Sequence, residues 1–189
     1  MGNYGAEAAA FVIQAVSGFF LLLVMLRLLL QLTRADFYNP ISQFIVKITN
    51  WAVVPLRRVI PSFRTLDMSS IVLLLIIQIL TLYLITLTRG IGISIAPLVV
   101  ISVAELVSLL LNVYLITIIA QAILSWVGPG TANPLTSLLY SLNEPVMRPA
   151  RRIIPPISGI DLSPIVVLIV LQLLKILVVG PLMDFGRIL

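Results

Sequence analysis

Residues 39–70 read NPISQFIVKITNWAVVPLRRVIPSFRTLDMSS, and residues 133–164 read NPLTSLLYSLNEPVMRPARRIIPPISGIDLSP. A shift of 94 positions aligns the two stretches without a gap. The matches include Asn39 with Asn133, Pro40 with Pro134, Pro55 with Pro149, Arg57-Arg58 with Arg151-Arg152, Pro61 with Pro155 and Asp67 with Asp161. Aligning any two apolar helices matches leucine with leucine by chance, but chance matches of proline, arginine and aspartate are much rarer. The chain is therefore predicted to contain two copies of one unit, residues 1–94 and 95–189.

The composition indicates a chain that is surrounded by lipid. Of its 189 residues, 60% are hydrophobic and 10% are charged, against roughly 25% charged in soluble domains. A soluble domain of this size keeps much of its surface in water and needs polar side chains there. The sequence has no cysteine and no histidine, which excludes disulfides, thiolate or imidazole catalysis and nearly every transition-metal site. No catalytic residue, metal or cofactor is predicted.

Four stretches are long and apolar enough to cross a membrane, which takes about 20 residues of helix. They cover about 8–32, 68–88, 97–127 and 162–180. A chain in hydrocarbon must close its backbone hydrogen bonds within each segment, so these stretches are predicted to be helices. The expected fold is an all-α membrane protein with two transmembrane helices in each unit.

The basic residues predict how the spans are oriented. They gather in residues 33–67 and 128–161, whereas the loop between the second and third spans holds only Arg89. Short basic loops stay in the cytoplasm, so both arginine segments are predicted to face the cytoplasm from the cell inner membrane, with both termini outside. Since each unit has an even number of spans, the copies are expected to be parallel, related by a pseudo-two-fold axis along the membrane normal. No basic residue precedes the first span, so a cleaved signal peptide is not expected.

Between its two spans, each unit carries a short amphipathic segment, at about 40–54 and 134–148. Apolar residues recur in both at helical spacing, opposite a polar face. About 14 residues of helix are too short to span the hydrocarbon. An interfacial helix lying in the headgroup plane is predicted, with a re-entrant loop as the alternative. Each segment opens with an N-cap asparagine and a proline at the first helical position, namely Asn39-Pro40 and Asn133-Pro134.

These two segments resemble the YggT family, also called YlmG. The resemblance is carried by the asparagine–proline start, the prolines before and after each arginine pair, and the ending GIDLSP at residues 159–164. The leading RADFYNP at residues 34–40 is similar to the two-copy bacterial form. The first copy departs from the pattern, with Arg64-Thr65-Leu66 in place of Ser158-Gly159-Ile160 and Ser70 in place of Pro164. If the tight turn of the second copy matters, the two copies are not equivalent.

The resemblance implies a membrane protein with no family catalytic residue to transfer. Bacterial members are associated with osmotic tolerance and potassium homeostasis, and in other lineages with cell-division gene neighbourhoods. Plastid relatives act in attaching haem to a b-type cytochrome and in organising nucleoids. Organellar relatives use a single copy, which implies that one unit can serve as a protein-interaction module.

The arginine doublets are the first candidate site. Arg57, Arg58, Arg151 and Arg152 offer planar donors for phosphate or carboxylate groups on a lipid or a partner protein. Alternatively, they only fix topology and contact headgroups. Basic residues that only set the topology could lie at different positions in the two loops. Both doublets instead occupy the same position in the repeat, followed by Pro61 and Pro155.

An aspartate follows each doublet at the same spacing, just before the next span. Asp67 and Asp161 are predicted to cap the start of that span, where negative charge is favoured. An ion pair with the preceding arginines is the alternative, and a cap does not forbid it.

Polar side chains inside the spans form the second candidate site: Arg27, Gln78, Glu105, Gln172 and Lys175. Gln78 and Gln172 match under the repeat and are predicted to hydrogen-bond across the pseudo-two-fold axis or to line a substrate path. The depths of Glu105 and Lys175 would let them form an ion pair. Arg27 is expected to extend to the headgroups, since its counterpart is the neutral Gln121.

Two functions fit these features. The preferred prediction is a non-enzymatic scaffold or assembly factor, which needs basic segments on one face. Its expected partners are anionic lipids and a membrane protein or a second copy of the chain. A component of potassium transport or of the osmotic-stress response needs oxygen ligands that converge in mid-membrane, for which the candidates are Asn112, Gln78, Gln172, Ser108 and Thr81. A membrane enzyme is disfavoured, because the sequence offers no paired carboxylates, no G-x-S-x-G motif and no phosphate loop. Nucleic acid is not an expected ligand.

Overall fold

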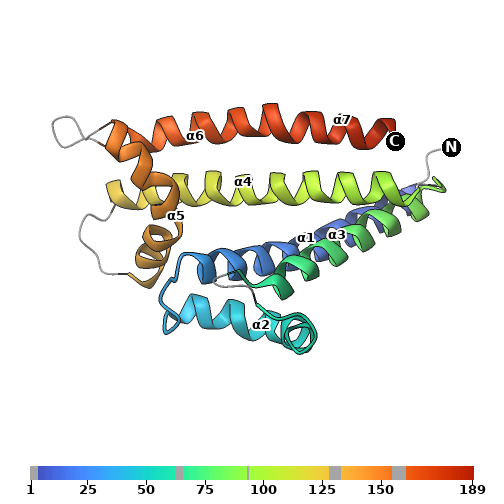
Figure 1. Cartoon of the computed structure of the whole chain (residues 1–189), viewed down its shortest axis with the longest axis horizontal. Helices are drawn as coiled ribbons and strands as arrows, with labels where there is room; N and C mark the ends of the chain where they lie inside the picture. The colour runs from blue at the N-terminus through green and yellow to red at the C-terminus, as the bar shows by residue number, and fades with distance from the viewer. Residues whose placement is uncertain (1–3, 63–65, 93, 128–132, 155–160) are drawn as a thin grey trace.

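In the computed structural model, described for residues 4–62, 66–92, 94–127, 133–154 and 161–189, every regular element is a helix (Figure 1). Four helical stretches are long and apolar enough to cross a membrane. They are α1 (Tyr4–Leu32), α3 (Met68–Thr88), α4 (Ile95–Val127) and the run of α6 (Ser163–Leu174), η1 (Lys175–Val179) and α7 (Gly180–Ile188). The two amphipathic segments form α2 (Pro40–Arg57) and α5 (Pro134–Ile153). The prediction of an all-α protein with four spans is confirmed.

The fourth span runs further than the sequence predicts. Gly180-Pro181 suggests an end near residue 180, but the helix continues to Ile188. Residues Lys175–Val179 form a wider π-helical turn just before this pair. Pro181 is the second residue of α7, inside this continuous helical run, and the π-helical turn before it loosens the regular hydrogen-bond pattern that a proline interrupts.

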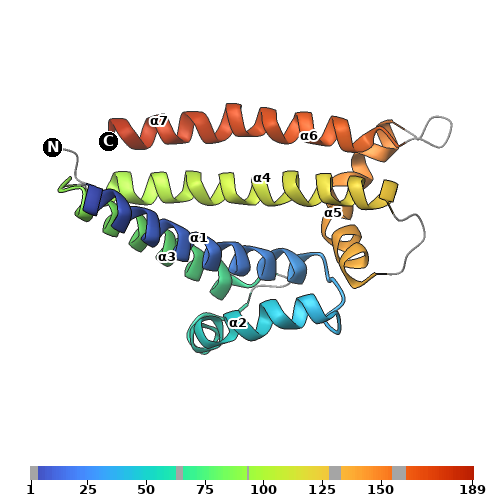
Figure 2. The same ribbon diagram turned by 180° about the vertical axis from the view of Figure 1, so that it is seen from behind.

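Both chain termini lie at one end of the bundle; α5 lies at the other end, and α2 runs from there along the ends of α1 and α3 that point away from the termini (Figures 1 and 2). Two parallel copies with two spans each require this arrangement. Helix α5 contacts both α4 and α6 and runs across their ends (Figure 1). We call the end that carries α2 and α5 the arginine end.

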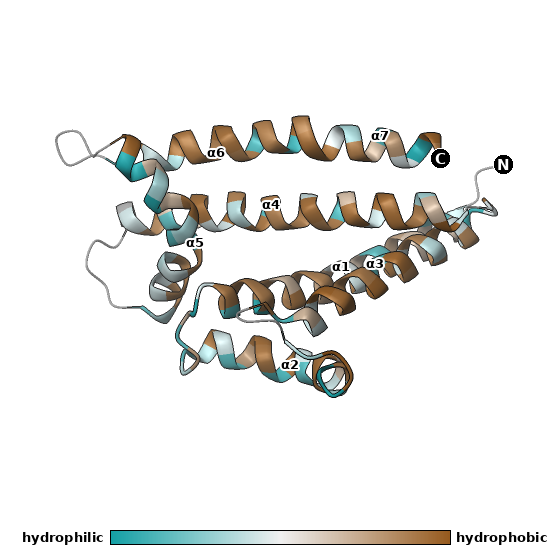
Figure 3. Cartoon of the chain, viewed as in Figure 1, coloured by the Kyte–Doolittle hydropathy of each residue, from teal (hydrophilic) through white to brown (hydrophobic). Residues whose placement is uncertain are grey.

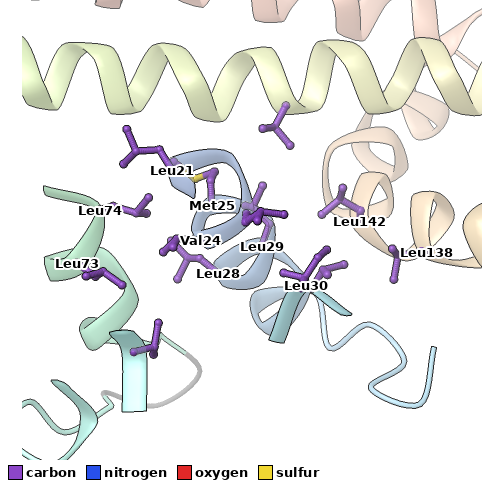
Figure 4. Close-up of a cluster of buried hydrophobic side chains, with 14 residues drawn as sticks. Leu21, Val24, Met25, Leu28, Leu29, Leu30, Leu73, Leu74, Leu138 and Leu142 are labelled. Atoms are coloured by element: carbon purple, nitrogen blue, oxygen red, sulfur yellow. The ribbon is translucent and has the colours of Figure 1, made fainter. Parts of the chain in front are cut away.

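Two clusters of buried apolar side chains hold the helices together. The first is built on α1, α2 and α3, around the fully buried Val24 and Val53, but it also takes Leu138 and Leu142 from α5 (Figure 4). The second cluster joins α4, α5 and the fourth span around Met147. Since the first cluster uses side chains of the second copy, the two units share a core.

The outer faces of the spans stay apolar, as Figure 3 shows by the brown along their length. Large side chains such as Phe11, Ile116 and Leu177 are more than half exposed. Exposing apolar surface to water costs about 25 cal/mol per Å². Surrounding the same surface with the hydrocarbon of a membrane avoids this cost. Polar side chains concentrate on α2 and α5 (Figure 3), where the chain leaves the apolar layer.

The C-terminal helix packs closely on α4 at Gly186. A Cβ added there would lie 2.7 Å from Cγ1 of Ile101 and 3.2 Å from Cγ1 of Val100. Gly180, in the same span, has no heavy atom within 4 Å of such a Cβ.

Gly186→Leu is therefore expected to push α7 away from α4 and to lower the free energy of unfolding by about 1–3 kcal/mol, the usual cost of overpacking. Thermal unfolding of the purified protein in detergent measures this loss, with Gly180→Leu as the matched control. Equal Tm values for the two variants would show that the close packing at Gly186 contributes nothing.

Candidate functional site

In the first copy, the doublet is tied to the start of the next span by an ion pair. Arg57 donates from Nη2 to Oδ2 of Asp67, and from Nε to Oδ1 at 3.4 Å. Asp67 is fully buried, whereas 38% of the Arg57 side chain is exposed. Arg57 also donates to Oε1 of Gln31 at 3.0 Å. One arginine thus connects the end of α2 to α1 and α3.

The second copy repeats this ion pair in a more open setting. Arg151 donates from Nε to Oδ2 of Asp161 at 3.0 Å, and from Nη1 to Oε2 of Glu144 at 3.2 Å. About a third of each of the Arg151 and Asp161 side chains is exposed. Water screens such a pair, so it stabilises the fold less than a buried one does.

The predicted capping role applies to only one of the aspartates. Asp161 accepts a hydrogen bond from the backbone N–H of Ser163 at 2.9 Å, at the start of α6. Asp67 makes no such bond to the backbone of α3 and instead accepts from the hydroxyl of Ser70 at 2.9 Å. The prediction of a cap at Asp67 is wrong, because this carboxylate pairs with Arg57 instead of the backbone of α3. The ion pair that was the alternative is present in both copies.

Burial by itself would raise the pKa of Asp67, but hydrogen bonds from Arg57 and Ser70 outweigh it and hold this pKa below its ordinary value. In Asp161, the weaker effect of burial is likewise outweighed by hydrogen bonds from Ser163 and Arg151, which lower its pKa. Both aspartates are therefore charged partners of arginine at neutral pH.

The second arginine of each doublet is free. Arg58 and Arg152 are exposed, and within the described residues the side chain of neither has a hydrogen-bond or ion-pair partner. The next residues, Val59 and Ile153, are equivalent in the repeat, and each is 80% exposed. Each copy thus presents an unpaired cation beside a large apolar side chain at the arginine end.

The asparagine–proline pairs start α2 and α5. Oδ1 of Asn39 accepts from the N–H of Ile41 at 2.9 Å, and that of Asn133 accepts from the N–H of Leu135 at 3.0 Å. Pro40 and Pro134 are the first helical residues. Nδ2 of Asn39 also donates to the carbonyl of Pro134 at 2.7 Å, so the cap of one copy holds the start of the other.

A second repeated contact lies beyond the arginine doublets. The hydroxyl of Ser69 donates to the carbonyl of Ile60 at 2.9 Å, and that of Ser163 donates to the carbonyl of Ile154 at 3.3 Å. Pro61, the residue after Ile60, is exposed. Pro155 lies outside the described residues.

Arg27 does not extend to the headgroups as predicted. It is buried, and Nη1 donates to Oγ1 of Thr49 and Oδ1 of Asn50, both at 2.8 Å. The second copy makes the same inter-helix contact with neutral groups, since Nδ2 of Asn143 donates to Oε1 of Gln121 at 2.7 Å. The sequence prediction missed Thr49 and Asn143, although the repeat aligns them.

Two predicted contacts inside the spans are wrong. Gln78 donates to Oε2 of Glu105, whereas Gln172 is exposed on the outer face of α6, so the two glutamines do not meet. Nζ of Lys175 donates to Oδ1 of Asn112 at 2.8 Å instead of pairing with Glu105. Asn112 and Glu105 are seven residues apart on α4, which is about 10 Å along the axis.

Gln78, Glu105 and Asn112 line a polar cavity of about 360 Å³ between α1, α3, α4 and α7. Four of the five side chains proposed for a transport path face it, and Gln172 does not. The polar residues of its wall are Gln14, Ser17, Gln78, Thr81, Glu105, Ser108 and Asn112. Within the described residues, no group of three histidine, cysteine, aspartate or glutamate side chains is placed to hold a metal ion.

The chain matches the CCB3/YggT family model twice, at residues 6–88 and 100–182. The protein PA0392 of Pseudomonas aeruginosa is 42% identical over 92% of this chain and 89% of its own length. A protein encoded in the proC 3′ region of Vibrio alginolyticus is 36% identical over 93% of this chain and 97% of its own length, and YggT of Escherichia coli K12 is 33% identical over 95% and 93%. No solved structure matches the chain.

The difference in burial between the two ion pairs predicts different costs for equivalent substitutions. Asp67→Asn leaves Arg57 without its buried partner and is expected to lower the free energy of unfolding by about 1–3 kcal/mol. Asp161→Asn, the matched control, should cost about 0–1 kcal/mol. Chemical unfolding in mixed micelles at pH 7 compares the two.

The same pair predicts a dependence on pH. Because the pKa of Asp67 is lowered in the folded protein, its stabilisation is complete above the unfolded carboxyl pKa near 4 and is lost as the pH falls through the folded value. The gap in stability between the wild type and Asp67→Asn should therefore close as the pH falls below about 4. A gap that stayed constant would mean that the charge of Asp67 is not what stabilises the fold.

Proposed function

Because this chain belongs to the CCB3/YggT family, a family of multi-pass membrane proteins, we propose that it is a non-enzymatic scaffold of the cell inner membrane. Its arginine end faces the cytoplasm and engages anionic lipid headgroups there, holding the two copies in a fixed orientation. Membrane-protein partners then assemble against this end.

The free arginines Arg58 and Arg152 carry this proposal. In each copy, the first arginine of the doublet is engaged by an aspartate, and the second extends beside an exposed apolar residue, Val59 or Ile153. A cation next to an exposed apolar side chain suits the boundary between headgroups and hydrocarbon. The arrangement occurs twice at one end of the bundle, so it favours attachment at two points.

The charge distribution supports the orientation. Exposed basic residues on α2 and α5 or next to them include Lys47, Arg58, Arg148 and Arg152, whereas Arg89 is the basic residue of the connection at the opposite end. Basic residues next to spans remain on the cytoplasmic side, where anionic lipids attract each of them by about 1 kcal/mol.

A photo-crosslinking residue at Val59 or Ile153 is expected to capture anionic lipid in native membranes, because both positions are exposed beside a free arginine. Tyr4, which is also largely exposed but lies at the opposite end, is the matched control position. Mass spectrometry identifies the adducts. Capture of a defined membrane protein at these two sites would add a scaffold partner, and no difference from Tyr4 would contradict the proposal.

Ion transport is the second candidate function, and the polar cavity favours it. Hydroxyl, amide and carboxylate oxygens from three spans line one space, and an intramembrane carboxylate such as Glu105 is a functional candidate by default. Such oxygens could replace part of the hydration shell of a potassium ion.

If the cavity conducts potassium, Gln78→Leu should reduce the flux into liposomes at least about tenfold, equivalent to about 1.4 kcal/mol. Gln172→Leu changes the equivalent residue of the second copy, which faces outwards, and should leave the flux unchanged. Absence of potassium flux through the wild-type protein would remove the transport function and leave the scaffold proposal intact.

A further inference from the structure

A second cavity, of about 510 Å³, opens at the arginine end of the first copy between the end of α1, residues 34–37 and α2. Its polar wall consists of Arg27, Gln31, Arg34, Ser42, Asn50 and Arg57. This volume lies in the range of ligand pockets in proteins.

Arg27 is a buried cation without a carboxylate partner. It is 5% exposed, and the acceptors of its Nη1 group, the side chains of Thr49 and Asn50 and the carbonyl of Val46, are all uncharged. A guanidinium has five N–H donors, and in the described part of the chain those on Nε and Nη2 find no acceptor. Burying a charge is costly unless an opposite charge accompanies it, so the site lacks an anion.

Ser42 points to the same conclusion. It lines the cavity and is 4% exposed, yet its hydroxyl oxygen has no hydrogen-bond partner among the described residues. A buried hydroxyl is normally paired, and rotation of this side chain toward the cavity would let a phosphate oxygen accept its hydrogen.

Arg34 occupies a backbone conformation that favours another residue. Its φ angle is 52°, in the left-handed region, which is unfavourable for residues with a Cβ. In the sequence of the second copy the equivalent position is Gly128, and glycine is the residue type for which the left-handed region carries no steric cost. An arginine held here against its backbone preference adds a third guanidinium to the cavity.

The second copy lacks this excess of positive charge. Gln121 and Gly128 replace Arg27 and Arg34, and Glu144, in place of Asn50, pairs with Arg151. Three arginines and Asp67 in the first copy thus correspond to one arginine and two carboxylates in the second. The helix contacts are equivalent, so the charges of the first copy are not required by the fold.

We propose that Arg27, Arg34, Arg57 and Ser42 form a binding site for a phosphate group, either on an anionic lipid headgroup or as free phosphate. Guanidinium groups bind phosphate oxygens through paired, charge-assisted hydrogen bonds. Arg27 lies five residues before the end of α1, about 8 Å along the helix, a depth that a headgroup phosphate reaches. This site rests on the proposed attachment of the arginine end to lipid. It adds that one specific pocket at this end binds the phosphate group.

The purified full chain in detergent tests the site. It is titrated with inorganic phosphate and, in separate samples, with phosphatidylglycerol or phosphatidylcholine, and binding is followed by the rise in Tm that a ligand of the folded state produces. A response to inorganic phosphate identifies free phosphate as a ligand, and a response to phosphatidylglycerol above that to phosphatidylcholine identifies a lipid. Either response supports the site when the variants below weaken it.

Two variants copy the second repeat. The double change Arg27→Gln with Thr49→Asn rebuilds the Gln121–Asn143 contact and removes the charge, and Arg34→Gly removes the unfavourable φ angle together with a guanidinium. Each should weaken binding about tenfold or more, the effect of one lost charge-assisted hydrogen bond. Arg34→Gly should also keep or raise the Tm measured without ligand, so a failure to fold cannot explain its loss of binding.

Arg89→Gln removes one positive charge at the opposite end and should bind as the wild type does. No response of the wild type to any probe, or equal responses of the wild type and both variants, would overturn the site. Crosslinking at Val59 and Ile153 is measured in the same variants. If it persists while phosphate binding is absent, the pocket is refuted and the attachment of the arginine end remains.

Discussion

The ion pair between the end of each amphipathic helix and the start of the next span determines how this protein is built. Arg57 with Asp67, and Arg151 with Asp161, each join the end of an amphipathic helix to the residue just before the next span. Without this tie, each amphipathic helix would be joined to its unit by apolar contacts and by its polar contact with the first span, Arg27 with Thr49 or Gln121 with Asn143, and its last turn would not be held to the next span. With it, the position of the second arginine of the doublet is fixed relative to the spans. The chemistry available at this end depends on that position.

Two equivalent frameworks carry different side chains. The caps, the ion pairs and the contact between the first span and the amphipathic helix occur in both copies. On this common frame the first copy accumulates arginine, whereas the second adds a carboxylate at Glu144 and replaces Arg27 with an amide. Duplication therefore supplies the architecture twice and leaves each copy free to acquire its own ligand.

Sequence reasoning predicted what depends on spacing along the chain. The number of spans, the parallel repeat and the family follow from apolar length and from matched prolines and arginines. The possibility of an arginine–aspartate pair followed from the equal spacing in both copies. The partners of Glu105, Lys175 and Arg27 depend on which side of a helix faces which neighbour. Residue counting gives depth in the membrane but not this rotation, and it gives depth only where the ends of a span are right. The fourth span continues to Ile188 instead of ending near residue 180. Lys175 therefore lies deeper than counted and contacts Asn112, about 10 Å along α4 from Glu105. Thr49 was overlooked because its role depends on how α2 crosses α1.

The first apolar cluster contains Leu138 and Leu142 of α5 as well as the side chains of α1 to α3 (Figure 4). One unit alone would leave a hydrophobic surface that only another unit can cover. The chain thus resembles a covalently linked dimer, in which fusion guarantees that two unlike halves meet in equal amounts. A homodimer of identical units would have to place any new residue on both sides of its axis. Fusion removes this symmetry requirement, and it allows a charged pocket to evolve on one side while the other side remains a purely structural support.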